Sequence, residues 1–252
     1  MLARRTQVLR ILAETGSVTV SDLSKRFEVA PITIRRDLEK LESEGLLTRV
    51  HGGAVIKAEP FIAKPLVDKE TLNSEAKEKI ALKAAELVNP GETIILDEGS
   101  TCIARARALR NHKGITVVTN GIKVASELTP YHHITTILIG GVCGHTNFVT
   151  YGYETLTQLQ RIRAHKYFMG IDAIQLGFGI SDADPHQVEL KRAKAASSQE
   201  VIGIADNSKL GKIGLVHIGS VGMLNKLVMN SPVHPAFREL FEAEGVTLIE
   251  VD

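Results

Sequence analysis

The pattern of apolar residues predicts an amphipathic helix at the start of this 252-residue chain. Apolar positions recur every three or four residues and stop at Gly16, a residue type that often follows the last turn of a helix. Such a stripe gives the helix a single buried face. The stripe consists of Leu2, Val8, Leu9, Ile11 and Leu12.

Two further short helices are predicted between residues 20 and 45. Ser21 can cap the second helix, in which Leu23 and Phe27 lie on one side. A turn follows, and Pro31 suits the first position of a third helix, which ends at Gly45. The buried face of this third helix carries Ile34, Leu38 and Leu41. Its other faces carry Thr33, Arg35, Arg36 and Lys40.

A β-hairpin is predicted directly after the third helix, over residues 46–55. The Gly52–Gly53 pair allows a tight turn and lets the backbone approach a phosphate closely. Two short helices followed by a hairpin form a winged helix-turn-helix, whose recognition helix reads the major groove with residues such as arginine. The alternative is a three-helix packing module with solvated arginines. The arginine cluster and the hairpin favour DNA binding.

The pattern changes to alternating strands and helices from residue 74 onward. Residues 58–73 have no clear period and contain Pro60 and Pro65, which predicts a linker with local structure. Short apolar segments then alternate with helix-length segments, which predicts a mainly parallel sheet covered on both faces. The predicted strands are 93–97, 115–120, 134–139, 166–171, 201–206, 226–229 and 246–251. The predicted helices include 75–88, 123–128, 153–161, 187–198 and 235–244. The expected fold is α/β, with a winged helix-turn-helix domain at 1–57 and a sheet domain at 74–252.

Small and polar residues follow five of these predicted strands. Parallel sheets bind ligands beyond the carboxyl ends of their strands. After the first strand, Gly99-Ser100-Thr101 precedes a helix whose first amides can hold a phosphate. Each of these strand ends is also typical of an ordinary turn, but five on one edge favour a ligand site. The other four ends carry Asn120, Gly140, Gly170 with Asp172, and Asp206 to Lys209.

Two lysines and a glutamate are candidate ligand contacts near this edge. Glu189 and Lys191 are two positions apart in a predicted helix, so their side chains diverge and only one can face a ligand. Lys209 is the better phosphate partner, because its compact ammonium suits that anion. The alternative is that these charges lie on a solvated helix and turn.

The charge is unevenly distributed along the chain. The whole chain has a formal net charge of +1, but residues 1–57 hold ten Lys and Arg against seven Asp and Glu. This small basic unit precedes a slightly acidic remainder, which suggests a division of labour between them. The two cysteines are too few for a disulfide framework, and the charged N-terminus has no apolar core behind it. A cytoplasmic location is therefore expected.

The motifs of both halves resemble the DeoR/GlpR family of bacterial transcriptional repressors. In the first half, the resemblance rests on residues 31–42, Gly45 and residues 49–54. In the second half, it rests on motifs at 97–101, 117–120, 140–141, 166–172, 189–193 and 205–211. The resemblance implies a sensor domain similar in fold to ribose-5-phosphate isomerase, which responds to phosphorylated sugars or polyols.

Three residues depart from the usual pattern of this family. Ala30 stands where Ser is usual, which removes an N-cap oxygen worth ~1 kcal/mol. Gln187 stands where many members have Glu, and Asn230 stands where the last strands usually end in Asp. The last two changes each remove a carboxylate from the surroundings of the expected pocket.

Other kinds of site find little support in the sequence. The nine histidines show no spacing typical of a metal site, so neither a metal nor another cofactor is expected. Cys102 lies near a predicted helix start and fits a small buried residue better than a redox sensor. An isomerase-like enzyme, with Asp97 or Glu98 and Lys209 as an acid–base pair, is the competing hypothesis. The attached basic module favours a regulator, which is not an enzyme.

The sequence therefore predicts a repressor whose affinity for operator DNA changes when it binds a phosphorylated sugar or polyol. One such module makes few phosphate contacts, so a homo-oligomer on repeated or palindromic sites is expected, without a membrane partner. The predicted DNA contacts are Ser21, Thr33, Arg35, Arg36, Lys40, Arg49, His51, Gly52 and Gly53. The predicted effector contacts are Asp97, Gly99, Ser100, Thr101, Asn120, Gly140, Gly170, Asp172, Glu189, Lys191 and Lys209.

Overall fold

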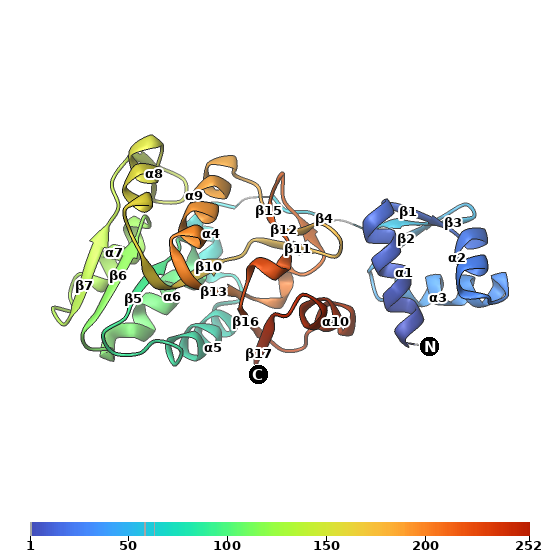
Figure 1. Ribbon diagram of the computed structural model, residues 1–252. Helices are drawn as coiled ribbons and strands as arrows, with labels where there is room; N and C mark the ends of the chain where they lie inside the picture. The colour runs from blue at the N-terminus through green and yellow to red at the C-terminus, as the bar shows by residue number, and fades with distance from the viewer. Residues whose placement is uncertain (1, 58, 63) are drawn as a thin grey trace.

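The computed structural model describes residues 2–57, 59–62 and 64–252 (Figure 1). Three helices and a three-stranded sheet form the N-terminal unit. The helices are α1 (Leu2–Thr15), α2 (Val20–Phe27) and α3 (Pro31–Ser43). The strands β1 (Ser17–Thr19), β2 (Leu47–Val50) and β3 (Gly53–Ile56) pair antiparallel in the order β1-β3-β2. The buried core is made by the predicted stripes, with Val8, Leu12, Leu23, Ile34, Leu38 and Leu41 all almost inaccessible to solvent.

The cap of α2 differs from the prediction. Thr19, and not Ser21, is the N-cap residue, because Thr19 ends the short strand β1 in an extended conformation. Its hydroxyl accepts a hydrogen bond from the Asp22 backbone N–H at 3.1 Å. Ser21 is therefore an exposed residue in the first turn of α2. The prediction missed β1, which is only three residues long.

The C-terminal unit is built on a seven-stranded parallel sheet, as predicted. Its order is β17-β16-β13-β10-β5-β6-β7. All seven predicted strands are present. Their bounds are β5 (Thr93–Leu96), β6 (Ile115–Thr119), β7 (Ile134–Leu138), β10 (Ala164–Gly170), β13 (Ser198–Ala205), β16 (Lys226–Asn230) and β17 (Thr247–Val251).

Helices cover both faces of this sheet (Figure 1). Alternate residues of each strand enter two separate cores, as β10 shows, where Tyr167 and Met169 join one core and Phe168 the other. One face is covered by α5 (Ser74–Ala85), α6 (Ser100–Ala108) and α7 (Ile122–Leu128). The other is covered by α8 (Tyr153–Gln160), α9 (Pro185–Ala196) and α10 (Pro235–Ala243).

Several short strands were not predicted, because segments of two to four residues carry no readable period. A small antiparallel sheet contains β11 (Ala173–Gln175), β12 (Gly179–Asp182) and β15 (Val216–Gly219). A hairpin of β8 (Val142–Gly144) and β9 (Val149–Tyr151) lies beyond β6 and β7. Among the helices that the structure describes, none has the length and apolar character needed to cross a membrane.

The segment between the two units packs against the C-terminal one. Strand β4 (Glu59–Pro60) pairs with β14 (Lys212–Ile213), and the Phe61 N–H donates to the Ile213 carbonyl at 2.7 Å. Helix α4 (Leu66–Thr71) follows, with Leu66 buried in the core beside α5 and α6. The expected local structure is therefore present, and it is fixed to the sheet domain.

Candidate ligand cavity and nucleic-acid surface

A cavity of about 370 Å³ lies where β5, β10 and β13 end. The chain reaches it from these strand ends, from the starts of α6 and α9, and from the segment before α5. Lining residues from the strand ends and from α6 are Gly99, Ser100, Thr101, Gly170, Asp172, Asp206 and Lys209. Those from α9, from α5 and from the segment before α5 include Gln187, Lys191, Lys77, Phe61, Lys69 and Asn73.

The start of α6 offers polar groups to this cavity. Gly99 precedes the helix with φ +102°, a conformation that favours glycine, and Ser100 begins it. The first backbone N–H groups of a helix have no partner within it, so they are available to an anion. The side chains of Ser100 and Thr101 line the cavity beside them. This arrangement is the one that the sequence predicted for a phosphate.

Three lysines gather at one side of the cavity. The Lys69 ammonium lies 2.9 Å and the Lys209 ammonium 4.0 Å from carboxylate oxygens of Asp172. The same two ammonium groups lie 5.3 and 5.2 Å from the centre of the Phe61 ring. Burial raises the pKa of Asp172, but the charges of the surrounding lysines outweigh this effect and leave that pKa below its ordinary value.

Lys77 is the most unusual of these lysines. It is buried, and its ammonium donates to the backbone carbonyls of Lys69, at 2.5 Å, and of Leu72. Burial lowers the pKa of Lys77, and the nearby Asp206 charge only partly opposes this. No carboxylate in the described part of the chain lies within 4.0 Å of this ammonium. A buried cation without a paired anion marks a place where a ligand anion is favourable.

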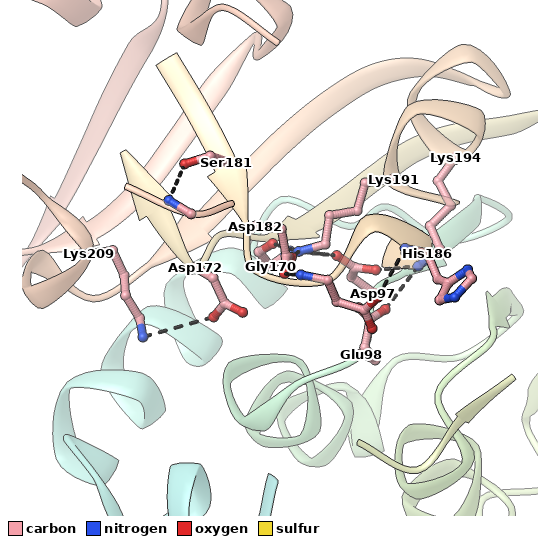
Figure 2. A network of polar contacts seen from close by, with 12 residues as sticks. Asp97, Glu98, Gly170, Asp172, Ser181, Asp182, His186, Lys191, Lys194 and Lys209 are labelled. Atoms are coloured by element: carbon pink, nitrogen blue, oxygen red, sulfur yellow. Dashed lines mark hydrogen bonds and ion pairs between the residues drawn. The ribbon is translucent and has the colours of Figure 1, made fainter. Parts of the chain in front are cut away.

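A second charged cluster lies between β5 and α9, and its members Glu98, Asp182 and Lys191 line the cavity (Figure 2). The fully buried ammonium of Lys194 pairs with Asp97 and, at 3.0 Å, with Glu98. Lys191 lies one turn earlier on the same helix and donates to the Gly170 carbonyl at 2.6 Å. It also lies 3.1 Å from an Asp182 oxygen and 3.6 Å from an Asp97 oxygen.

The pKa values of Asp97 and Glu98 in this cluster are shifted in opposite directions. Burial and the adjacent Asp97 charge raise the pKa of Glu98 to about 7. Burial also acts to raise the pKa of Asp97, but Lys194 and Lys191 outweigh it and hold that pKa well below its usual range. Asp97 is therefore a fixed anion that keeps both lysines in place, whereas Glu98 can carry or lose a proton near neutral pH.

The cavity contains seven of the eleven predicted effector residues. Gly99, Ser100, Thr101, Gly170, Asp172, Lys191 and Lys209 line it. Asp97 is fully buried and contacts the cavity only through other residues, such as the Gly170 N–H, which it binds at 3.1 Å.

Three predicted effector residues lie outside the cavity. The β8–β9 hairpin covers the ends of β6 and β7, so Asn120 donates its amide to the Thr150 carbonyl at 2.9 Å. The Gly140 N–H likewise donates to the Gln158 side chain at 3.1 Å. Glu189 is exposed, because it points away from the face of α9 that carries Lys191. Of Glu189 and Lys191, only one was expected to face the ligand site, and Lys191 is the one that lines the cavity.

The departures from the family pattern have different surroundings. Gln187 lines the cavity and is buried. Asn230 lies outside it and accepts a hydrogen bond from the Asn207 N–H at 2.8 Å, which holds the turn before Lys209. Ala30 is the N-cap residue of α3 and gives no side-chain cap, while Pro31 occupies the first turn as predicted.

The sequence reasoning missed Lys69, Lys77 and Lys194. Lys194 had a detectable signal, because Gln187, Lys191 and Lys194 have the i, i+4, i+7 spacing of one helix face. In the sequence, however, lysines at that spacing look like the solvent-exposed face of a helix. Their burial becomes evident only when the fold places Asp97 against them. Lys69 lies in the segment that the sequence left without a regular element.

The N-terminal unit exposes a basic helix. Arg35, Arg36 and Lys40 are exposed on α3, and Thr33 is half-buried. Within the described residues, the ion pairs of α3 involve neither Arg35 nor Arg36, whereas Lys40 lies 3.2 Å from Glu44. The exposed guanidinium groups are therefore available to a nucleic acid.

The hairpin holds two of its predicted DNA contacts within the protein. Arg49 pairs with Glu42 at 2.7 Å and with Glu39 at 2.9 Å, which fixes the hairpin to α3. Gly53 is buried against β1, and a Cβ atom there would lie 1.9 Å from the Val18 carbonyl oxygen. The close pairing of β3 with β1 therefore explains why glycine occupies position 53, and approach to a phosphate is not needed to explain it. His51 and Gly52 remain exposed at the tip.

Both halves match models of one protein family. Residues 4–59 match the DeoR-like helix-turn-helix domain, and residues 72–231 match the DeoR C terminal sensor domain. The chain belongs to the DeoR family. The family predicted from the sequence is thereby confirmed.

Relatives of this DeoR-family protein are regulators. It is 33% identical over 229 residues to the glycerol-3-phosphate regulon repressor of Escherichia coli K12, covering 91% of this chain and 90% of that protein. It is 31% identical over 243 residues to the HTH-type transcriptional regulator GolR of Listeria innocua, covering 96% of each chain. These names support a transcription regulator and do not favour the enzyme hypothesis.

Two solved structures are similar to the DeoR-family chain over about half its length. Ribose 5-phosphate isomerase A from Neisseria gonorrhoeae is 22% identical, covers 56% of this chain and 55% of its own, and has a TM-score of 0.41. The delta subunit of eIF2B from Chaetomium thermophilum is 16% identical, with 57% and 51% coverage and a TM-score of 0.42.

Proposed function

We propose that this DeoR-family protein is a repressor of carbohydrate or polyol metabolism genes, and that a phosphorylated sugar or polyol in the cavity changes its affinity for operator DNA. The observation that carries this proposal is the group of ammoniums formed by Lys69, Lys77 and Lys209. Lys77 in particular is buried without a paired carboxylate. A phosphate dianion matches these ammoniums and the first amides of α6.

The remainder of the cavity suits hydroxyl groups. Asp172, Asp206, Asn73 and Ser208 line it and are hydrogen-bond acceptors or donors that a polyol can use. A cavity of about 370 Å³ accommodates a small phosphorylated metabolite. Within the described residues, no group of three His, Cys, Asp or Glu side chains is placed to hold a metal ion.

The DNA-binding part of the proposal assigns the major groove to α3. Arg35 and Arg36, with Thr33, are proposed to contact bases, and His51 with the Gly52 turn is proposed to lie at the phosphate backbone. One such unit makes few phosphate contacts, so we propose a homo-oligomer on repeated or palindromic half-sites. Because operator DNA lies in the cytoplasm of a prokaryotic cell, we propose that the protein acts there.

Regulation then follows from linkage. A ligand that binds one arrangement of the protein better than the DNA-competent one lowers operator affinity by the coupling free energy, typically about 1–3 kcal/mol. The segment that contains β4 and α4 joins the DNA-binding unit to the sheet domain. Its residues Phe61 and Lys69 line the cavity, so this segment connects the cavity directly to the DNA-binding unit.

The test combines ligand binding with DNA binding. Sugar and polyol phosphates, inorganic phosphate and the unphosphorylated parents are screened by thermal shift, where a ligand at 100 times its Kd adds about 2.7 kcal/mol. Stabilisation by phosphorylated compounds alone supports the proposal. Lys77→Met and Lys209→Ala should reduce this stabilisation and the effector response while operator binding in a gel shift is unchanged.

The matched control is Lys113→Ala, which removes an exposed lysine that does not line the cavity. A normal effector response in both Lys77→Met and Lys209→Ala would refute the phosphate assignment. A response to unphosphorylated sugars equal to that of their phosphates would refute it as well.

A further inference from the structure

Gln187 carries a buried amide that hydrogen-bonds to none of the residues that the structure describes. Its residue is 3% exposed and lines the cavity, yet neither the oxygen nor the nitrogen of its amide has a hydrogen-bond partner among the described residues. A buried amide without partners costs about 1–3 kcal/mol, so such groups are rare in folded proteins. This amide is therefore placed to bind something that enters the cavity.

The usual structural role of a glutamine at this position is performed by another residue. Gln187 is the third residue of α9, where a Glu or Gln side chain often bonds back to the N–H of the N-cap residue. Here the N-cap residue is Asp184, and its N–H donates to the Asp182 side chain at 3.0 Å. The Gln187 side chain is thus not needed to begin the helix.

The surroundings of Gln187 are unfavourable for a second anion. Asp182 and Asp184 line the same part of the cavity. Lys191, one turn along α9, is already shared by Asp182, Asp97 and the Gly170 carbonyl. Figure 2 shows Lys209 and Asp172 at the left of the view and Lys194 at the right, with Asp182 and Lys191 between them. Counted by lining charges, the surroundings of Gln187, with Asp182, Asp184 and Lys191, are thus more acidic than those of Lys69, Lys77 and Lys209, which include Asp172 and Asp206.

We infer that Gln187 is a specificity-determining residue, which hydrogen-bonds a neutral hydroxyl or carbonyl group of the effector and rejects a carboxylate there. A primary amide can donate to a hydroxyl or carbonyl oxygen and accept from a hydroxyl, whereas a carboxylate at this place would lie beside the charges of Asp182 and Asp184. The effector class is accordingly a phosphorylated polyol or sugar, and not a phosphorylated sugar acid. This inference rests on the proposed function, because it places the phosphate at Lys69, Lys77 and Lys209.

The probes for this inference are matched pairs in which a terminal hydroxymethyl group is replaced by a carboxylate. Three pairs serve: glycerol 3-phosphate with 3-phosphoglycerate, ribitol 5-phosphate with 5-phosphoribonate, and glucitol 6-phosphate with 6-phosphogluconate. Inorganic phosphate reports the anion contacts alone. Titration calorimetry on the full chain gives the affinity of each probe.

The wild-type protein should bind the hydroxyl member of at least one pair about tenfold or more tightly than its carboxylate partner. Gln187→Met, which keeps the size and removes the amide, should weaken that hydroxyl member about tenfold, the loss expected from one or two neutral hydrogen bonds. Inorganic phosphate should bind both proteins equally. Gln199→Met, an exposed glutamine on β13, should change none of these values.

Thermal stability without added probe separates recognition from a structural role. Because the Gln187 amide forms no hydrogen bond within the described part of the chain, Gln187→Met should melt no lower than wild type. A lower melting temperature together with unchanged probe affinity would show that the residue only supports the fold, and would overturn the inference.

The remaining outcomes also distinguish the two proposals. If phosphate compounds bind but Gln187→Met binds them as tightly as wild type, or both members of every pair bind equally, the inference is overturned and the proposed function stands. If no phosphorylated probe and no inorganic phosphate binds, the proposed function fails and the inference fails with it.

Discussion

Replacing Lys194 by Met should destabilise the C-terminal unit strongly. The Lys194 ammonium is fully buried, and it pairs with Asp97, whose side chain is also 0% exposed, and with Glu98 at 3.0 Å. Removing one partner of a buried ion pair leaves an uncompensated charge and typically costs about 3–5 kcal/mol. The Met side chain keeps most of the volume, so the loss is electrostatic and not a cavity effect.

This loss of unfolding free energy can be converted into a change in melting temperature. For a unit of this size, each kcal/mol lowers Tm by about 2–4 °C, so Lys194→Met should lower it by roughly 10 °C. Calorimetry or circular dichroism measures the shift. Adding Asp97→Asn to this variant should restore part of the loss, because Asp97 is the anion that Lys194→Met leaves without its partner.

A surface ion pair provides the control. Lys226 pairs with Glu200 at 2.6 Å, but both side chains are partly exposed, so Lys226→Met should cost less than about 1 kcal/mol. If Lys194→Met melts within a few degrees of Lys226→Met, the cluster does not depend on this charge. The argument that Asp97 is a fixed anion would then be refuted.

Two further predictions concern the acidic residue of this cluster and the DNA-binding helix. The Glu98 pKa of about 7 in the folded protein exceeds its ordinary value of 4.5, so its contribution to stability is full below pH 4.5 and is lost as pH rises through 7. Glu98→Gln should flatten the loss of stability between pH 5 and 8 in urea unfolding; an unchanged profile would exclude Glu98 as its source. Arg35→Ala should reduce discrimination between operator and scrambled DNA about 5- to 150-fold in a gel-shift series, since a bidentate contact to a base is worth about 1–3 kcal/mol. Unchanged specificity, compared with the surface control Arg110→Ala, would remove Arg35 from recognition.

The central sheet was predictable because its strands are apolar and a helix separates most of the successive ones. Strands such as Thr93–Leu96 and Ile115–Thr119 consist of residues that are buried on both faces, and their sequence shows this directly. The starts of α3 and α6 were equally readable, since Pro31 and Gly99 mark them. Local sequence patterns were sufficient to predict an element wherever its own residues determine where it begins and which residues it buries.

The lysines of the cavity were less predictable because their role depends on distant partners. Lys194 becomes a buried cation only because β5 brings Asp97 to it from 97 positions away. Lys77 is a buried ammonium only because the fold brings the carbonyls of Lys69 and Leu72 to it as acceptors. Asn120 was predicted to contact the effector, but it does not line the cavity. The β8–β9 hairpin, whose sequence has no readable period, covers the end of β6 and binds the Asn120 amide.

The packing of residues 59–72 has a practical consequence for chimeric regulators. Phe61, Lys69 and Asn73 are walls of the cavity, although they precede α5. A chimera that takes a foreign DNA-binding unit and is joined after Asn73 would exchange these walls, and its response to effector should change. A chimera joined after Lys57 retains them. Transplanting operator choice without altering effector choice therefore requires a junction at the end of the hairpin.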